Sequence, residues 1–193
     1  MKRALAVCLF ALIAAAAVPA SASIFVAMDQ AELVAASQAV VVGRVLEVRS
    51  FWNDEATAIL TEAVVQVDQT VAGEAPGIVT VRTFGGTVGS LRIEASGFPT
   101  FTEGQRMLLF LDGVGSTAEV VGYQQGQFRI VTRVSDGLDV AVPAVDGGAT
   151  LVRMDGARVE RPRALPLSAL VESIRATAGE LRADRDHGHR ATR

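Results

Sequence analysis

The sequence contains one cysteine and two histidines among its 193 residues. Cys8 lies in an apolar run near the N-terminus, and His187 and His189 lie close to the C-terminus. The long stretch between them therefore cannot form a disulfide, a Ser-His-Asp triad, or a zinc site of histidine and cysteine. We predict a non-enzymatic protein with no cofactor or metal, held together by apolar burial. Hydrolysis by carboxylates alone stays open as an alternative, because it needs neither residue type.

Lysine is almost absent as well, and Lys2 is the only one. Residues 23–152 carry 7 arginines against 15 acidic residues, whereas residues 153–193 carry 9 arginines against 6 acidic residues. An acidic body repels the phosphates that supply most of the non-specific affinity for nucleic acid, so we expect no nucleic-acid partner. The basic C-terminal stretch has two interpretations, a solvated end or a contact with an anionic surface.

The N-terminus has the features of a secretory signal peptide. A positively charged start precedes 15 consecutive apolar residues, Ala4–Val18, and small residues follow them. This run is shorter than the roughly 20 residues that a membrane-spanning helix needs. We therefore predict cleavage between Ala22 and Ser23, which removes residues 1–22. The mature protein would be periplasmic or extracellular and would have no membrane span.

Residues 23–154 read mainly as short strands with glycine-rich turns. The clearest strand is Ala39–Phe51, in which Gly43 indicates a bulge or a sharp bend. A short helix is expected before it, with Asp29 as N-cap and Glu32 completing a capping box. Further strands are expected at residues 58–71, 78–84, 90–95, 106–111, 118–123, 127–134, 138–142 and 149–154. We expect 118–123 and 127–134 to pair as a hairpin, and the whole segment to form an all-β barrel or sandwich.

The C-terminal part of the chain has a different pattern. Residues 155–166 contain two prolines and are predicted to be a linker. Apolar residues then recur at helical spacing, which predicts an amphipathic helix over residues 167–183. This helix either packs on the β-domain or binds a partner or membrane, and its short length and mixed charge favour packing. Residues 184–193 are predicted to be a disordered tail.

The candidate binding loop follows the first long strand. Phe51, Trp52, Asn53 and Asp54 place two large aromatic side chains beside two polar ones, which suits a binding surface. The alternative is that the aromatic side chains fold back over the open end of the barrel. The glycine-rich segment 85–89 lacks the lysine and the following helix of a phosphate-binding loop, so we interpret it as a connection between strands.

Three motifs carry a resemblance to known proteins: Gly85-Gly86-x-x-Gly89, Gly97-Phe98-Pro99-x-Phe101-x-x-Gly104 and Gln125-Gly126-x-Phe128. Within residues 29–134 they resemble an uncharacterised family of exported bacterial proteins, some of which accompany matrixin-type metalloproteases. The order of a helix and two long strands also resembles the netrin-like form of the oligonucleotide/oligosaccharide-binding (OB) barrel, which tissue inhibitors of metalloproteinases share.

This resemblance implies a small OB-like, netrin-like β-barrel of five strands, with residues 50–57 on its ligand face. The leading functional hypothesis is an exported, non-enzymatic binding module of the cell envelope or exterior, with a secreted or envelope protein as its partner. The alternative that the resemblance suggests is a modulator or companion of a secreted metalloprotease.

Overall fold

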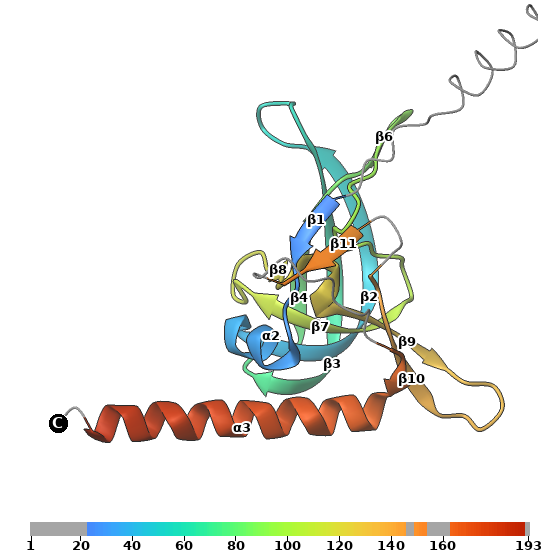
Figure 1. Cartoon of the computed structure of the whole chain (residues 1–193). Coiled ribbons are helices and arrows are strands. Elements are labelled where there is room, and N and C mark those ends of the chain that lie inside the picture. The colour runs from blue at the N-terminus through green and yellow to red at the C-terminus, as the bar shows by residue number, and fades with distance from the viewer. Residues whose placement is uncertain (1–22, 146–148, 154–162, 192–193) are drawn as a thin grey trace, which may run out of the picture.

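The computed structural model describes residues 23–145, 149–153 and 163–191. An eight-stranded sheet dominates it, with two helices packed to one side (Figure 1). The elements are β1 (Ser23–Val26), α2 (Gln30–Ala36), β2 (Ala39–Trp52), β3 (Ile59–Gly73), β4 (Ile78–Phe84), β5 (Gly86–Val88), β6 (Leu91–Ile93), β7 (Arg106–Asp112), β8 (Glu119–Val120), the 3₁₀ turn η1 (Tyr123–Gly126), β9 (Gln127–Thr132), β10 (Asp139–Pro143), β11 (Ala149–Val152), β12 (Leu165–Pro166) and α3 (Leu167–Ala191). The prediction of a mainly β protein with minor helices is confirmed.

The sheet is built around β2. Its strand order is β12-β10-β9-β7-β2-β3-β4, with β8 paired to β7 beside β9. The predicted bulge in β2 is present, because the register with β3 shifts between Val42 and Gly43. A Cβ at Gly43 would overlap the carbonyl oxygen of Gln66, so this close approach of two strands requires glycine.

The short helix α2 begins as predicted. The Asp29 carboxylate accepts a hydrogen bond of 2.8 Å from the Glu32 backbone N–H, and the Glu32 carboxylate accepts one of 2.7 Å from the Asp29 N–H. This reciprocal capping box satisfies two donors that the helix itself leaves unpaired. It sets where α2 starts, and Leu33 and Val34 consequently face the core.

The centre of the sheet is buried on both faces, which explains the unbroken apolar runs of β2 and β7. Alternate residues of β2 enter two separate clusters. The helix-side core comprises Leu33, Val34, Val40, Val42, Val71, Leu108, Phe110, Phe128, Ile130, Ala141, Leu170, Val171, Ile174 and Ala178. The inner core comprises Ala39, Val41, Val45, Ala63, Val65, Val79, Val81, Met107, Leu109, Leu111, Ala118 and Val120.

The C-terminal helix α3 contacts both α2 and strand β3 of the sheet. Its apolar stripe lies in the helix-side core, as the sequence pattern indicated. The predicted disordered tail at residues 184–193 is a correction, because α3 continues to Ala191 and runs past the body (Figure 1). The apolar stripe ends at Leu181. Apolar periodicity therefore predicted the packed turns only.

The sheet does not close into the expected barrel, which corrects that prediction. Within the described residues, the outer edge of β4 meets the β8 segment through a single bridge between Val81 and Ala118. Its two hydrogen bonds, Arg82 N–H to Ala118 O and Ala118 N–H to Thr80 O, are each 2.8 Å long. β8 is too short to extend the ladder, because Gly122 and Tyr123 turn the chain into η1 with positive φ angles of 66° and 58°.

One strand pairing differs from the sequence prediction, and two others were not predicted. β8 and β9 pair with β7 at Leu111–Asp112 and Met107–Leu109 rather than with each other, since η1 separates them. The predicted strand at 90–95 is present in shortened form as β6, which pairs with β5 in a separate hairpin. β11 pairs in parallel with β1, so the sequence-distant ends of the β-domain lie together.

Some predictions fall partly or wholly outside the described residues. They are the signal peptide at 1–22, the last residue of the strand at 149–154 and most of the linker at 155–166. The prediction is wrong for the last linker residues, 165–166, because they form strand β12 beside β10. No helix within the described ranges is long and apolar enough to cross a membrane.

Candidate functional site

The half of the β2–β3 hairpin nearest its turn presents two chemically different faces. Cross-strand pairing places Arg49 opposite Glu62 and Glu62 opposite Arg82, which forms a charged row on the outer face. The neighbouring row consists of Ser50, Thr61 and Thr83, and its side chains point to the opposite face. Three hydroxyl groups therefore lie side by side across β2, β3 and β4.

The charged row on the outer face is internally satisfied. The Glu62 carboxylate accepts hydrogen bonds of 2.6 Å from Arg82 and 3.4 Å from Arg49. The Arg82 hydrogen bond is the main cause that holds the pKa of Glu62 below its ordinary value, against the opposing effect of burial. Both guanidinium groups also lie over the Phe51 ring, at 5.2 Å for Arg49 and 5.9 Å for Arg82.

The four residues of the predicted binding loop therefore point in different directions. Phe51 belongs to the outer arginine cluster, whereas Trp52 takes the opposite face and is 38% exposed. The side-chain oxygen of Asn53 accepts hydrogen bonds from the backbone N–H groups of Thr57 and Ala58, at 2.8 and 2.9 Å. Asn53 therefore organises the turn. Asp54 is exposed at the tip. The structure does not assemble these side chains into one surface, and their binding role stays a prediction.

The hydroxyl row faces a hollow that we call the inner groove. It has a volume of about 520 Å³ and lies between the long hairpin on one side and β5, β6 and residues 94–101 on the other. Its lining residues are Val48, Ser50, Thr61, Thr83, Phe84, Gly85, Gly86, Thr87, Arg92, Ile93, Glu94, Ala95, Ser96, Phe98, Pro99, Thr100, Phe101 and Gln124. Pockets that hold small ligands typically span roughly 300–1,000 Å³, so the size is suitable.

The hydroxyl hydrogens of this row are engaged by the protein itself. Thr61 donates to the Gly85 carbonyl oxygen at 2.7 Å, so the 2.8 Å contact between Ser50 and Thr61 has Ser50 as donor. Thr83 donates to the Pro99 carbonyl oxygen at 3.1 Å. Each hydroxyl has a single hydrogen, and the oxygen lone pairs are what remains for a ligand.

Two glutamines hold the wall formed by residues 97–100. The Gln127 side chain is fully buried and bonds both backbone groups of Thr100, donating to the oxygen at 2.8 Å and accepting from the nitrogen at 3.3 Å. The Gln124 amide donates to the Phe98 carbonyl oxygen at 3.0 Å. These bonds are charge-neutral and partly buried, and they hold the wall in place without a ligand.

Aromatic rings continue from the groove across the neighbouring surface. Phe84 and Phe98 have ring centroids 5.6 Å apart, Phe98 and Tyr123 are 5.0 Å apart, and Tyr123 and Phe25 are 4.8 Å apart. Phe84 and Tyr123 are 38% and 44% exposed. The row therefore alternates accessible rings, Phe84 and Tyr123, with partly buried ones, Phe98 and Phe25, and Phe84 lies at the rim of the inner groove.

Sequence patterning identified only part of this site. Ser50 lies in the predicted loop, and Phe98 and Phe101 were recognised as aromatic candidates, but Thr61 and Thr83 were not. Their signal was present, since each is a polar residue at an inward position of a strand that is otherwise apolar inward. Their alignment into one row depends on strand register, which the sequence pattern does not specify.

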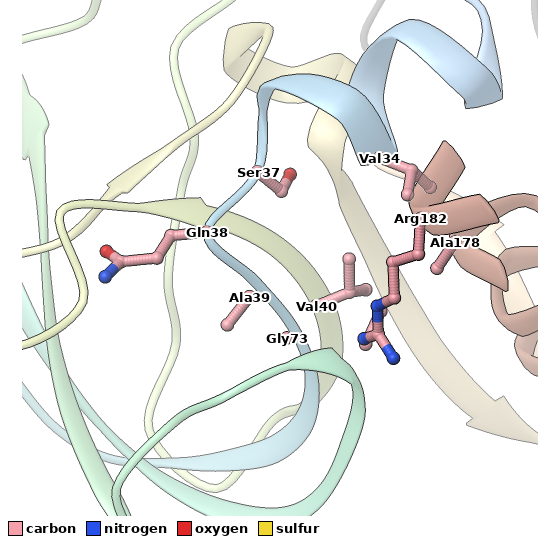
Figure 2. Close-up of a pocket in the computed structure, with 9 residues that line it drawn as sticks. Val34, Ser37, Gln38, Ala39, Val40, Gly73, Ala178 and Arg182 are labelled. Atoms are coloured by element: carbon pink, nitrogen blue, oxygen red, sulfur yellow. The ribbon is translucent and has the colours of Figure 1, made fainter. Parts of the chain in front are cut away.

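A second hollow of about 500 Å³ lies between α2, α3 and the start of β2, and Figure 2 shows its lining. The Arg182 side chain reaches beside Val40, whereas the Gln38 amide points away from the other lining side chains (Figure 2). Arg182 is the only charged lining residue, Ser37 and Gln38 are the other polar ones, and the remaining residues are valine, alanine or glycine. Few polar groups converge there, so we consider the inner groove the better candidate.

A third hollow, of about 260 Å³, lies beneath α2 and is lined mainly by apolar residues, with Asp29, Gln30 and Gln125 as its polar ones. The described residues contain no group of three or more histidine, cysteine or acidic side chains arranged to hold a metal. Comparisons with protein-family models, curated proteins and solved structures gave no match. The functional argument therefore rests on the geometry of the chain itself.

Proposed function

We propose that the protein is an exported, non-enzymatic binding module of the cell envelope or exterior that holds its ligand in the inner groove. The observation that carries this proposal is the row of three hydroxyl groups facing a pre-formed hollow of about 520 Å³. Inward positions of a strand are normally apolar, and polar groups gathered there are typical of ligand sites. Export follows from the signal-peptide pattern of residues 1–22.

The charge of the groove favours binding over hydrolysis. Glycoside hydrolysis normally requires two carboxyl groups on opposite sides of the bond that breaks. Among the described residues that line the groove, Glu94 is the only carboxylate, and it lies 2.6 Å from Arg92 in an ion pair. A two-carboxylate mechanism therefore has no support at this site.

The OB-like, netrin-like assignment belongs to the same proposal. An OB fold is a partly open five-stranded barrel. The order β4-β3-β2-β7-β8, with the Val81–Ala118 bridge leading back to β4, is consistent with such a topology in which the last strand is shortened. On this assignment the inner groove occupies the end of the barrel next to the turn of the first two strands.

Site-specific photocrosslinking in the producing organism tests the proposed function. A photoreactive amino acid replaces Arg92 at the groove or, as a matched control, Arg49 on the outer face. We expect a crosslinked product that depends on the groove position and is absent from the control. Equal labelling at both positions, or none at the groove, would contradict the proposal.

A further inference from the structure

We propose that the ligand of the inner groove is a neutral glycan, bound through its hydroxyl groups and the apolar face of a sugar ring. This inference rests on the proposed function and specifies its ligand class. Three independent features of the groove support it: the direction of its hydrogen bonds, its charge and its aromatic rim.

The hydrogen-bond direction selects a ligand that is rich in donors. Ser50 donates to Thr61, Thr61 donates to the Gly85 carbonyl, and Thr83 donates to the Pro99 carbonyl. The row consequently offers oxygen lone pairs to the groove. A ligand with closely spaced O–H groups can donate to them, whereas a carboxylate or phosphate oxygen would meet oxygen lone pairs and be repelled.

The charge of the groove also favours a neutral ligand. Its two ionised residues, Arg92 and Glu94, neutralise each other across 2.6 Å, and both side chains are mostly exposed. No net charge is therefore available to compensate an ionic ligand for its desolvation. Residues 23–152 are net acidic, which further disfavours anionic polymers.

The aromatic rim supplies the apolar part of the contact. Phe84 is 38% exposed at the end of β4 and is supported from behind by Phe98, with ring centroids 5.6 Å apart. A sugar ring presents axial C–H groups on one face and hydroxyl groups around its edge. Such a ring can pack against Phe84 while its edge donates to Ser50, so one ligand satisfies both features.

An extended peptide is the competing occupant. Strand addition needs a free backbone edge along the site. The edge of β4 nearest the groove is partly engaged with the β8 segment at Thr80 and Arg82, and the groove surface consists of side-chain hydroxyls instead. The geometry therefore favours a glycan, and peptide binding becomes an outcome that the test can detect.

Isothermal titration calorimetry of the mature protein tests the inference. The probes are neutral hexasaccharides of glucose, mannose, xylose and N-acetylglucosamine, with an oligogalacturonate as the anionic control. We expect saturable binding of at least one neutral probe and none of the anionic one. Phe84→Ala should weaken that binding about tenfold and Ser50→Ala about fivefold.

Two controls separate binding from folding. Arg49→Ala removes a charged side chain from the outer face and should leave the affinity unchanged. The melting temperature of Ser50→Ala should stay within about 2 °C of the parent protein, since Thr61 keeps its own acceptor. A loss of affinity that accompanied unfolding would not count in favour of the proposal.

The outcomes distinguish this inference from the function on which it rests. Absence of binding by every neutral probe, or binding that Phe84→Ala and Ser50→Ala do not affect, would overturn the glycan assignment. If the crosslink at Arg92 then joined a polypeptide, the binding function would stand with a peptide ligand. If the crosslink were also absent, the proposed function itself would fail.

Discussion

At the scale of single residues, the turn of the long hairpin shows how a polar side chain that sequence marks as a binding candidate also stabilises the fold. Asn53 seemed a ligand contact by sequence, because it lies between aromatic and acidic residues. In the structure its carbonyl oxygen accepts two backbone hydrogen bonds, and its amide donates to Thr57 and Glu55 at 3.0 and 3.1 Å. Such side-chain mimicry of a backbone turn is typical of asparagine.

Replacing Asn53 should therefore affect stability more than binding. We expect Asn53→Ala to lower the free energy of unfolding by about 1–2 kcal/mol, because two backbone donors lose their acceptor. Asn53→Asp keeps that acceptor and should cost less. Urea unfolding of both variants measures the difference. Equal stability of Asn53→Ala and the parent protein would show that the turn does not depend on this side chain.

The charged row of the outer face predicts a dependence on pH. The pKa of Glu62 lies below its ordinary value of 4.5, so the folded state holds this carboxylate ionised more strongly than the unfolded state does. Its contribution is present above that ordinary value and is lost as the pH falls through the folded-state pKa. Glu62→Gln should therefore cost about 1 kcal/mol at neutral pH and progressively less in acid.

Chemical denaturation at a series of pH values checks this expectation. Glu47→Gln changes an exposed carboxylate in the neighbouring strand β2; it is the control and should show little effect at any pH. A deficit for Glu62→Gln that stayed constant from neutral pH to below 4.5 would rule out the ion pair as its cause.

At the scale of elements, periodicity predicted the packed structure well. The capping box of α2, the long strands β2 and β3, and the apolar stripe of α3 all appear where the sequence placed them. Hairpin pairing was less predictable, because two positive-φ residues, Gly122 and Tyr123, redirect the chain between β8 and β9. A tyrosine is not a strong turn signal, so the pattern favoured a simple hairpin.

The helix-side core makes α3 part of the folded domain rather than an appendage. Within α3, the Ile174 side chain is fully buried, whereas the adjacent Arg175 is exposed. Ile174→Ala should lower the free energy of unfolding by about 3 kcal/mol through lost burial and a cavity, and Arg175→Ala should change it little. Thermal or urea unfolding compares the two. Similar stabilities would mean that α3 does not pack on the sheet in solution.

The wall of the inner groove depends on a glycine at the start of its loop. Gly97 has a φ angle of +86°, and a Cβ there would overlap the Phe25 ring. Gly104 has a similar φ angle of +79° with open space around it. Gly97→Ala should therefore destabilise the protein by about 2 kcal/mol more than Gly104→Ala, since only the first change adds overpacking to backbone strain.

A double variant separates those two causes. In a Phe25→Ala background the overlap disappears, and Gly97→Ala should then cost about as much as Gly104→Ala. If the extra cost persisted without the Phe25 ring, the contact between β1 and this loop would not be its origin.

At the scale of the whole molecule, the predicted cleavage site adjoins the folded domain at Ser23. The predicted cleavage site immediately precedes β1, whose first residue pairs with Ala149 of β11. We expect the protein produced with its own leader to appear outside the cytoplasm with Ser23 as its N-terminal residue. Intact-mass and N-terminal analysis of the exported protein check this, and a chain that retained Met1 would contradict it.

The overall architecture was only partly predictable from sequence, for reasons that are physical. Apolar alternation predicts that a strand exists but not which edge its neighbour occupies, so the open sheet and the parallel β1–β11 pair were not foreseen. The inner groove could not be predicted for the same reason, because Ser50, Thr61 and Thr83 come together only through strand register. The aromatic loop was visible in the sequence, while the hydroxyl row behind it required the fold.

The most direct test of the account is amide chemical-shift mapping of the ¹⁵N-labelled mature protein during titration with the neutral oligosaccharide that binds most tightly. We predict that the largest changes fall on Ser50, Thr61, Thr83 and residues 94–101, and that Arg49 and Glu62 on the outer face change little. Changes centred on Arg182 between the two helices, or on the outer arginine cluster, would contradict the inner groove as the binding site.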